Sequence, residues 1–82
     1  MTDKRLQVFC AVAETLSFSE AARITGISQP AVSKHIAQIE EEIGSALFIR
    51  VGRSVILTEK GSKLNSIARN ILDQYKLIDN LR

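Results

Sequence analysis

A cluster of polar side chains near the middle of the chain has the types and spacing needed to contact nucleic acid. Gln29, Ser33 and Lys34 would share the exposed face of one helix, and Ser28 and Pro30 lie at its start. Amides and hydroxyls hydrogen-bond to base edges in a DNA major groove, whereas hydroxyls, cations and helix N-termini hold phosphates. Because any surface helix has a polar face, the alternative is that this face is only solvated. These residues are therefore candidate DNA contacts.

The residues before this cluster predict a short helix that ends in a tight turn. Ser17 and Glu20 form a Ser-x-x-Glu capping box at the start of the helix. Gly26 can adopt the left-handed conformation that turns the chain, and Ile27 would fill the angle between this helix and the next. The inward face of the short helix is expected to consist of Ala21, Ala22 and Ile24.

A second helix is expected to begin at Ser28, which is a good N-cap, with Pro30 in its first turn. Gly44 would end it. Its apolar residues recur at the spacing of one buried stripe, which consists of Val32, Ile36, Ile39 and Ile43. Two helices around a tight turn make a helix-turn-helix, whose second helix enters a DNA major groove.

A small hairpin is predicted after the second helix. Residues 48–50 and 55–57 are short apolar runs rich in β-branched residues, and Gly52 lies between them. Arg50 on the first strand and Arg53 at the tip could reach backbone phosphates or the adjacent minor groove. The alternative is a basic hairpin that is only solvated.

The N-terminal segment predicts a scaffold helix, capped by Thr2 or Asp3. Its apolar stripe is expected to be Leu6, Phe9, Cys10 and Ala13, closed by Leu16. Cys10 is the only cysteine, so no intrachain disulfide can form, and we interpret it as a small core residue rather than a reactive thiol. Together with the lack of a signal peptide or membrane span, it favours a cytoplasmic protein.

The C-terminal segment predicts a long helix that Thr58 caps, with Gly61 allowing close packing in its first turn. Its apolar stripe is too long for a domain of 82 residues to cover, which predicts dimerisation through a second copy of the same helix. No stop signal precedes Arg82, so we expect the helix to lead into a further segment. The predicted dimerisation residues are Leu64, Ile67, Ile71, Tyr75 and Ile78.

The net charge of +2 is mild, so the placement of charge carries more information than its sum. Glu40, Glu41 and Glu42 cluster at the far end of the second helix. Lysines and arginines lie around its start and in the segments that follow. One end of the helix would repel phosphate and the other would attract it.

The whole chain resembles the N-terminal domain of LysR-type transcriptional regulators. The resemblance rests on residues 18–22 (Phe-Ser-Glu-Ala-Ala), residues 28–33 (Ser-Gln-Pro-Ala-Val-Ser), Leu47-Phe48, and residues 57–61 (Leu-Thr-Glu-Lys-Gly). It implies a mostly α fold, in which a winged helix-turn-helix of three helices and a small two-stranded β wing precedes a long amphipathic linker helix. The expected division is a DNA-binding domain over residues 1–58 and a dimerisation helix over residues 59–82.

The resemblance also implies a function. Gln29, Pro30, Ser33 and Lys34 would approach bases and phosphates of operator DNA, while Arg53 and Arg50 anchor the wing. The protein would act as a dimer on an interrupted inverted repeat, and a full-length form could be a higher oligomer. A small-molecule effector would bind only through a C-terminal domain that this chain lacks. Thr25-Gly26 and Lys60 depart from the usual family residues, but neither departure removes a presumed DNA contact.

Two other classes of function compete with DNA binding. A protein-interaction module could use the face from Gln29 to Lys34 on a protein partner, and the salt dependence of DNA affinity would discriminate the two. An enzyme would need a catalytic constellation, but Cys10 and the only histidine, His35, fall on different predicted helices. A lone histidine without ligands at suitable spacing is weak evidence for a metal, so no cofactor or metal is expected.

Overall fold

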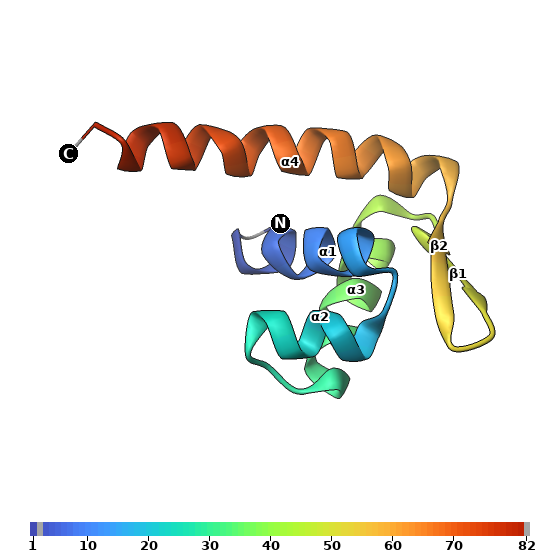
Figure 1. The fold of residues 1–82 in the computed structure, drawn as a ribbon. Helices are drawn as coiled ribbons and strands as arrows, with labels where there is room; N and C mark the ends of the chain where they lie inside the picture. Colours follow the sequence, from blue (N-terminus) through green and yellow to red (C-terminus); the bar gives the residue numbers. More distant parts are fainter. Residues whose placement is uncertain (2, 82) are drawn as a thin grey trace.

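A computed structural model describes Met1 and residues 3–81, and it has the predicted winged helix-turn-helix followed by a long helix (Figure 1). The elements in chain order are α1 (Asp3–Thr15), α2 (Phe18–Thr25), α3 (Gln29–Ile43), β1 (Phe48–Val51), β2 (Ser54–Leu57) and α4 (Glu59–Asp79). The predicted cap at Thr2 lies outside the described residues, and Asp3 is the first residue of α1. Within the described residues, no helix is both long and apolar enough to cross a membrane.

Helix α1 is the centre of the fold, with α4 on one side and α2 and α3 on the other (Figure 1). It is therefore buried on more than the single stripe predicted: its buried residues are Leu6, Val8, Phe9, Cys10, Ala11 and Val12. Leu16 does not close that stripe, because its side chain is 37% exposed. Its φ of 54° instead ends α1 in a left-handed conformation, and its N–H donates to the Val12 carbonyl (2.7 Å).

Helix α2 begins with half of the predicted capping box. The Ser17 hydroxyl accepts the Glu20 N–H (3.2 Å), but the Glu20 carboxylate turns to Arg23 (2.8 Å) instead of returning to Ser17. The Ser17 N–H donates to Thr15 Oγ1 (3.3 Å). The prediction for Ile24 is wrong, since this residue is 54% exposed and α2 packs on the core through Phe18, Ala21 and Ala22.

The turn into α3 and the end of α3 are as predicted. Gly26 is left-handed (φ 72°) and caps α2, while the Ser28 hydroxyl accepts the Ala31 N–H at the start of α3. Gly44 is also left-handed (φ 80°) and ends α3. The predicted buried stripe of α3 is confirmed for Val32, Ile36 and Ile39, and Ile43 is half-buried. Ile27 in the turn is half-buried too, as are Phe18 and Phe48.

Strands β1 and β2 pair antiparallel, with Arg50 opposite Val55 and Val51 opposite Ser54. Gly52 has a φ of 61° in the first position of the turn, where a two-residue hairpin loop favours glycine. The Val55 N–H donates to the Leu16 carbonyl (3.1 Å), and the Phe48 ring lies 5.3 Å from that of buried Phe9. These contacts hold the wing against the corner between α1 and α2.

Helix α4 starts at a closely packed junction with the loop before β1. The Thr58 hydroxyl accepts the Gly61 N–H (3.0 Å) and donates to the Ala46 carbonyl (2.7 Å). Gly61 is buried against the backbone of Leu47. Further along, Ala68 is fully buried and Leu64 and Leu72 are partly buried on the core, while the C-terminal part of α4 runs beyond α1 (Figure 1).

Candidate nucleic-acid interface

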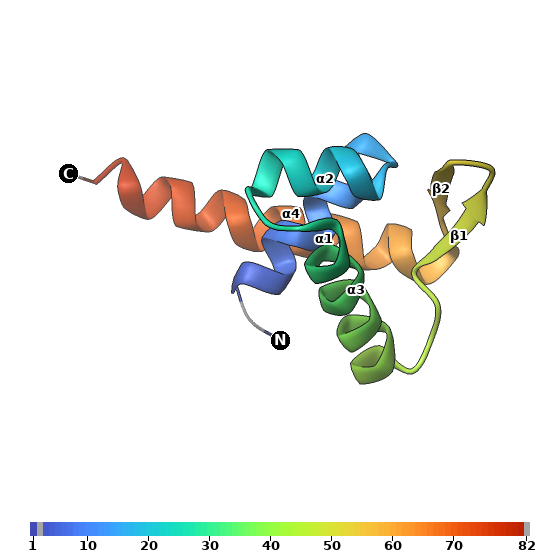
Figure 2. The same cartoon turned by 90° about the horizontal axis from the view of Figure 1, so that it is seen from below.

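The start of α3 and the wing lie on the face of the molecule that is opposite α4. Figure 2 views this face and shows α2, α3 and the hairpin in front of α4. Ser28, Gln29, Pro30 and Lys34 are exposed there, and Ser33 is half-buried. The Ser28 hydroxyl is occupied by the helix cap, because it accepts the Ala31 N–H (3.2 Å). That hydroxyl can still donate its own O–H, and the amide of Gln29 and the ammonium of Lys34 are exposed beside it.

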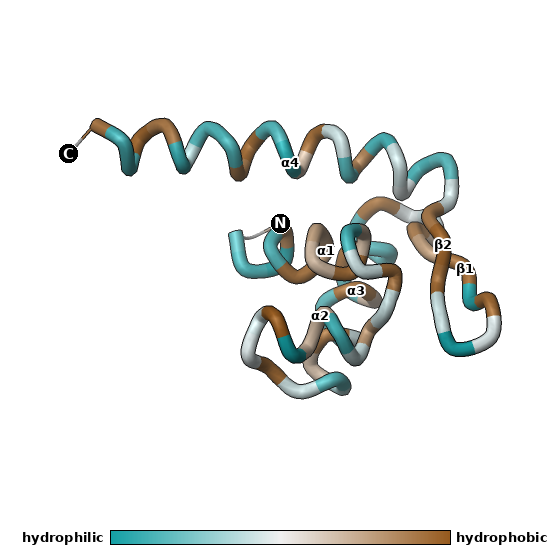
Figure 3. Tube along the Cα trace, viewed as in Figure 1, coloured by the Kyte–Doolittle hydropathy of each residue, from teal (hydrophilic) through white to brown (hydrophobic). Residues whose placement is uncertain are grey.

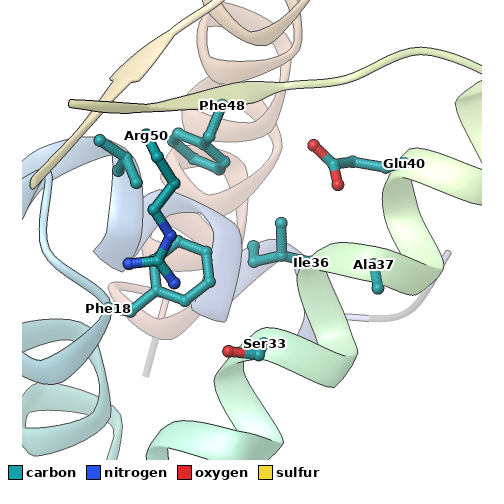
Figure 4. Close-up of a pocket in the computed structure, with 8 residues that line it drawn as sticks. Phe18, Ser33, Ile36, Ala37, Glu40, Phe48 and Arg50 are labelled. Atoms are coloured by element: carbon teal, nitrogen blue, oxygen red, sulfur yellow. The ribbon is translucent and has the colours of Figure 1, made fainter. Parts of the chain in front are cut away.

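The two wing arginines occupy different positions. Arg53 is exposed in the turn, at the tip of the hairpin. Arg50 projects from β1, and its guanidinium carbon lies 5.1 Å from the centre of the Phe18 ring on α2. Arg50 also lines a groove of about 260 Å³ between α3 and the wing (Figure 4). The groove residues are Phe18, Ser33, Ile36, Ala37, Glu40, Phe48, Arg50 and Val55.

The basic side chains on this face are Lys34 on α3 and the two wing arginines. Among the described residues, Lys34, Arg50 and Arg53 have no carboxylate oxygen within 4.0 Å. A polyanion could thus pair with all three cations without breaking an ion pair in the protein.

Two of the three carboxylates at the acidic end of α3 bind other parts of the same chain. Glu40 accepts the Leu47 N–H (2.7 Å), although its carboxylate also borders the groove. Glu42 pairs with the Met1 amino group (2.8 Å), and this hydrogen bond lowers the pKa of the Glu42 carboxyl. Glu41 is exposed. The acidic end of α3 is therefore where the sequence predicts it, but Glu40 and Glu42 bind the Leu47 N–H and the Met1 amino group.

Sequence reasoning did not identify the contact between Phe18 and Arg50. Phe18 is part of the motif at residues 18–22, but the contact joins α2 to β1, and no local pattern in the sequence relates these two elements. Cys10 is buried, and burial raises the pKa of its thiol, as for a core residue. Within the part of the chain that the structure describes, no group of three or more His, Cys, Asp or Glu side chains could hold a metal ion.

The predicted dimerisation residues divide between two faces of α4. Leu64 is half-buried and packs on the core of its own chain, while Ile67, Ile71, Tyr75 and Ile78 are exposed. Tyr75 also donates a hydrogen bond to Asp3 Oδ1 (2.9 Å), which raises the pKa of the phenol. Figure 3 shows that hydrophobic positions recur along α4 to the C-terminal end, well past the part that covers α1.

Comparison with known proteins gives a family match and many relatives. Residues 4–62 match the family described as bacterial regulatory helix-turn-helix protein, lysR family. The HTH-type transcriptional regulator CbbR of Rhodospirillum rubrum is 46% identical over 96% of this chain and 28% of its own length. The RuBisCO operon transcriptional regulator of Allochromatium vinosum is 37% identical over the same shares. This chain thus spans a little over a quarter of the length of these curated relatives.

Solved structures of similar proteins include DNA complexes. The BenM DNA-binding domain with benA site 1 DNA has a TM-score of 0.91 and 33% identity, covering 99% of this chain and 91% of that chain. The CbnR DNA-binding domain with DNA has a TM-score of 0.90 and 30% identity, covering 98% and 92%. Full-length CbnR with its target DNA has a TM-score of 0.89 and 30% identity, covering 98% of this chain and 28% of that chain.

Proposed function

This chain belongs to the lysR family of bacterial regulatory helix-turn-helix proteins, and from that premise we propose that it is the sequence-specific, double-stranded DNA-binding part of a transcriptional regulator. The observation that carries the proposal is the exposed start of α3 beside three cations that have no acidic partner among the residues that the structure describes. Helix α3 would enter the major groove, where Gln29 and Ser33 reach base edges and Lys34 meets a phosphate. The wing would contact the backbone or the minor groove through Arg53 and Arg50.

We further propose that the protein binds DNA as a homodimer through α4. Four of the predicted dimerisation residues, Leu64, Ile67, Ile71 and Ile78, fit the alternating three- and four-residue spacing of the heptad pattern of helix pairing, with the polar Gln74 at the position between Ile71 and Ile78. The fifth, Tyr75, lies next to this stripe and donates a hydrogen bond to Asp3 of its own chain. Apart from Leu64, which packs on the core of its own chain, this stripe lies beside the face that Ala68 and Leu72 turn to the core, so a second copy of α4 can cover it without competing with α1. Two α3 helices related by a two-fold axis would then read an interrupted inverted repeat.

The full-length protein would include an effector-binding domain and would bind a small molecule in addition to DNA. The curated relatives extend well beyond the share that this chain covers, which leaves room for an effector-binding domain that senses a small molecule. Such a domain could also support a higher oligomer. A bacterial regulator that binds chromosomal DNA works in the cytoplasm.

Selection of duplexes from a random pool tests the proposal directly. We expect the recovered fragments to share a half-site that is repeated in inverted orientation at a fixed spacing. Affinity for these fragments should fall linearly with salt on a log-log plot, with a slope of about −0.9 per phosphate neutralised. Recovery of no common sequence, together with no salt-dependent affinity, would leave the protein-interaction function as the better explanation.

Replacing Gln29 by alanine is expected to weaken specific binding by about 1–3 kcal/mol while leaving affinity for random DNA nearly unchanged. An exposed amide at the start of α3 can pair with a base edge and so adds to discrimination more than to general affinity. Titrations of the selected and random duplexes measure the two effects separately. Gln7→Ala removes an exposed glutamine from α1 and is the matched control. Equal losses on both duplexes would make Gln29 a backbone contact.

Replacing Arg53 by alanine is expected to weaken binding to selected and random duplexes alike and to lower the magnitude of the salt slope by about one. This result follows if the guanidinium at the wing tip pairs with a phosphate. Arg69→Ala removes the same charge from an exposed position on α4, which lies on the other side of α1, and should leave the slope nearly unchanged. A loss that depends on the DNA sequence would place Arg53 in the minor groove instead.

A further inference from the structure

Phe18 connects the hydrophobic core to the guanidinium of Arg50. Its ring meets the Phe48 ring edge-on at 6.3 Å, and the Phe48 ring lies 5.3 Å from that of Phe9, which is fully buried. The other side of this aromatic series faces the groove, where Arg50 lies over the Phe18 ring (Figure 4). Core packing therefore fixes the position of the Phe18 ring beneath the guanidinium.

Arg50 is oriented by this contact without losing its hydrogen-bonding capacity. Among the described residues it has no carboxylate within 4.0 Å and no hydrogen-bond acceptor. The guanidinium carbon lies over the Phe18 ring, and an aromatic ring takes up none of the conventional N–H hydrogen bonds that a guanidinium can donate. Ser33 of α3 borders the same groove, so the guanidinium lies beside the helix that is proposed to enter the major groove.

We propose that Phe18 is a positioning residue that holds Arg50 ready for a DNA backbone phosphate next to α3, an inference that rests on the proposed function. A free arginine side chain has many rotamers, and fixing one of them on binding costs affinity. Stacking on an aromatic face restricts those rotamers before the phosphate arrives, and the attraction between cation and ring adds to this restriction. Phe18 thereby strengthens a contact that Arg50 makes.

A double-mutant cycle on the 82-residue chain tests this coupling, with a duplex that the wild-type chain selects from a random pool as the probe. Arg50→Ala is expected to weaken binding by about tenfold and to lower the magnitude of the salt slope by about one. Phe18→Leu, which keeps an apolar side chain against Phe48, should weaken binding by about two- to fivefold with an unchanged slope. In the Arg50→Ala background, Phe18→Leu should have no further effect on affinity.

A second measurement reports the stacking itself. In the free protein, the ring current of Phe18 should shift the nuclear magnetic resonance signals of the Arg50 side-chain protons. Phe18→Leu should remove this shift, whereas Phe18→Tyr retains an aromatic face and should preserve both the shift and the affinity. Thermal unfolding of each variant ensures that affinities are compared between folded proteins.

Several results would overturn the proposal. An equal loss of affinity on Phe18→Leu with and without Arg50 would show that Phe18 acts through the placement of α2. An Arg50→Ala variant that binds as tightly as wild type would remove the contact that Phe18 is proposed to support, while leaving DNA binding by α3 intact. Failure of the proposed function is distinguishable, because the wild-type chain itself would then bind no duplex with salt-dependent affinity.

Discussion

Replacing Gly61 by alanine is expected to lower the free energy of unfolding by about 3 kcal/mol, the upper part of the range for overpacking. In an open helix the same change is stabilising by about 1 kcal/mol, because alanine is the better helix former. At Gly61 an added Cβ would overlap the carbonyl oxygen of Leu47. That oxygen belongs to the backbone and also accepts the Thr58 N–H (3.0 Å), so no side-chain rotation relieves the overlap. The junction between α4 and the wing must move instead.

Chemical denaturation monitored by circular dichroism measures the change. Asn70→Ala is the matched control, because Asn70 is an exposed residue inside the same helix and its replacement should stabilise by a few tenths of a kcal/mol. A Gly61→Ala variant that gains stability as the control does would show that the junction can open without cost, and that Gly61 has no packing role.

Much of the fold follows from short-range signals that the sequence displays. Ser28 and Thr58 are N-caps because a hydroxyl accepts an N–H three residues later, and this interaction needs only local geometry. Gly26 and Gly44 end their helices because a left-handed residue costs glycine little. The period of the apolar residues then places Val32, Ile36 and Ile39 in the core. Each of these features was predictable from a few neighbouring residues.

The remaining features depend on which elements meet in space. Leu16 adopts a left-handed conformation that leucine rarely takes, and its carbonyl accepts an N–H from the wing. Ile24 is exposed although its spacing suits an inward face, because α2 is short and packs on the core through Phe18, Ala21 and Ala22 instead. On α4, the choice of Leu72 over Ile71 for the core is made by the position of α1. Periodicity alone cannot make that choice.

The candidate site shows the same division. Ser28, Gln29, Pro30 and Lys34 are neighbours at one capped helix start, so their exposure could be predicted from the sequence. The position of Arg50 could not, because it depends on Phe18 of α2 and on the strand pairing that sets Arg50 opposite Val55. Glu40 likewise accepts the Leu47 N–H across the loop that follows α3. This carboxylate therefore stabilises the loop, a role that the cluster of three glutamates in the sequence does not indicate.

Replacing Ile71 by glutamate is expected to convert the protein to a folded monomer. Ile71 is 39% exposed in the single chain, whereas its neighbours Ala68 and Leu72 make the contact with the core. A charge at Ile71 can therefore stay in water in the monomer but would be buried without a partner between two copies of α4. Sedimentation and circular dichroism together measure the oligomeric state and the helical content. Leu77→Glu is the matched control, because Leu77 is 58% exposed but lies off the heptad stripe.

Loss of the dimer should reduce affinity for a two-half-site duplex by about a hundredfold or more, while affinity for a single half-site stays the same. The reason is physical linkage: once one α3 helix is bound, a dimer holds the second at a fixed separation, about 34 Å or a multiple of it when both read the same face of the DNA. A monomer gains nothing from the second half-site. A folded Ile71→Glu variant that remains dimeric with unchanged affinity would contradict the α4 interface. The Leu77→Glu variant carries the same added charge and should stay folded and dimeric. If Ile71→Glu alone unfolds the protein, Ile71 belongs to the core and its placement outside the core is wrong.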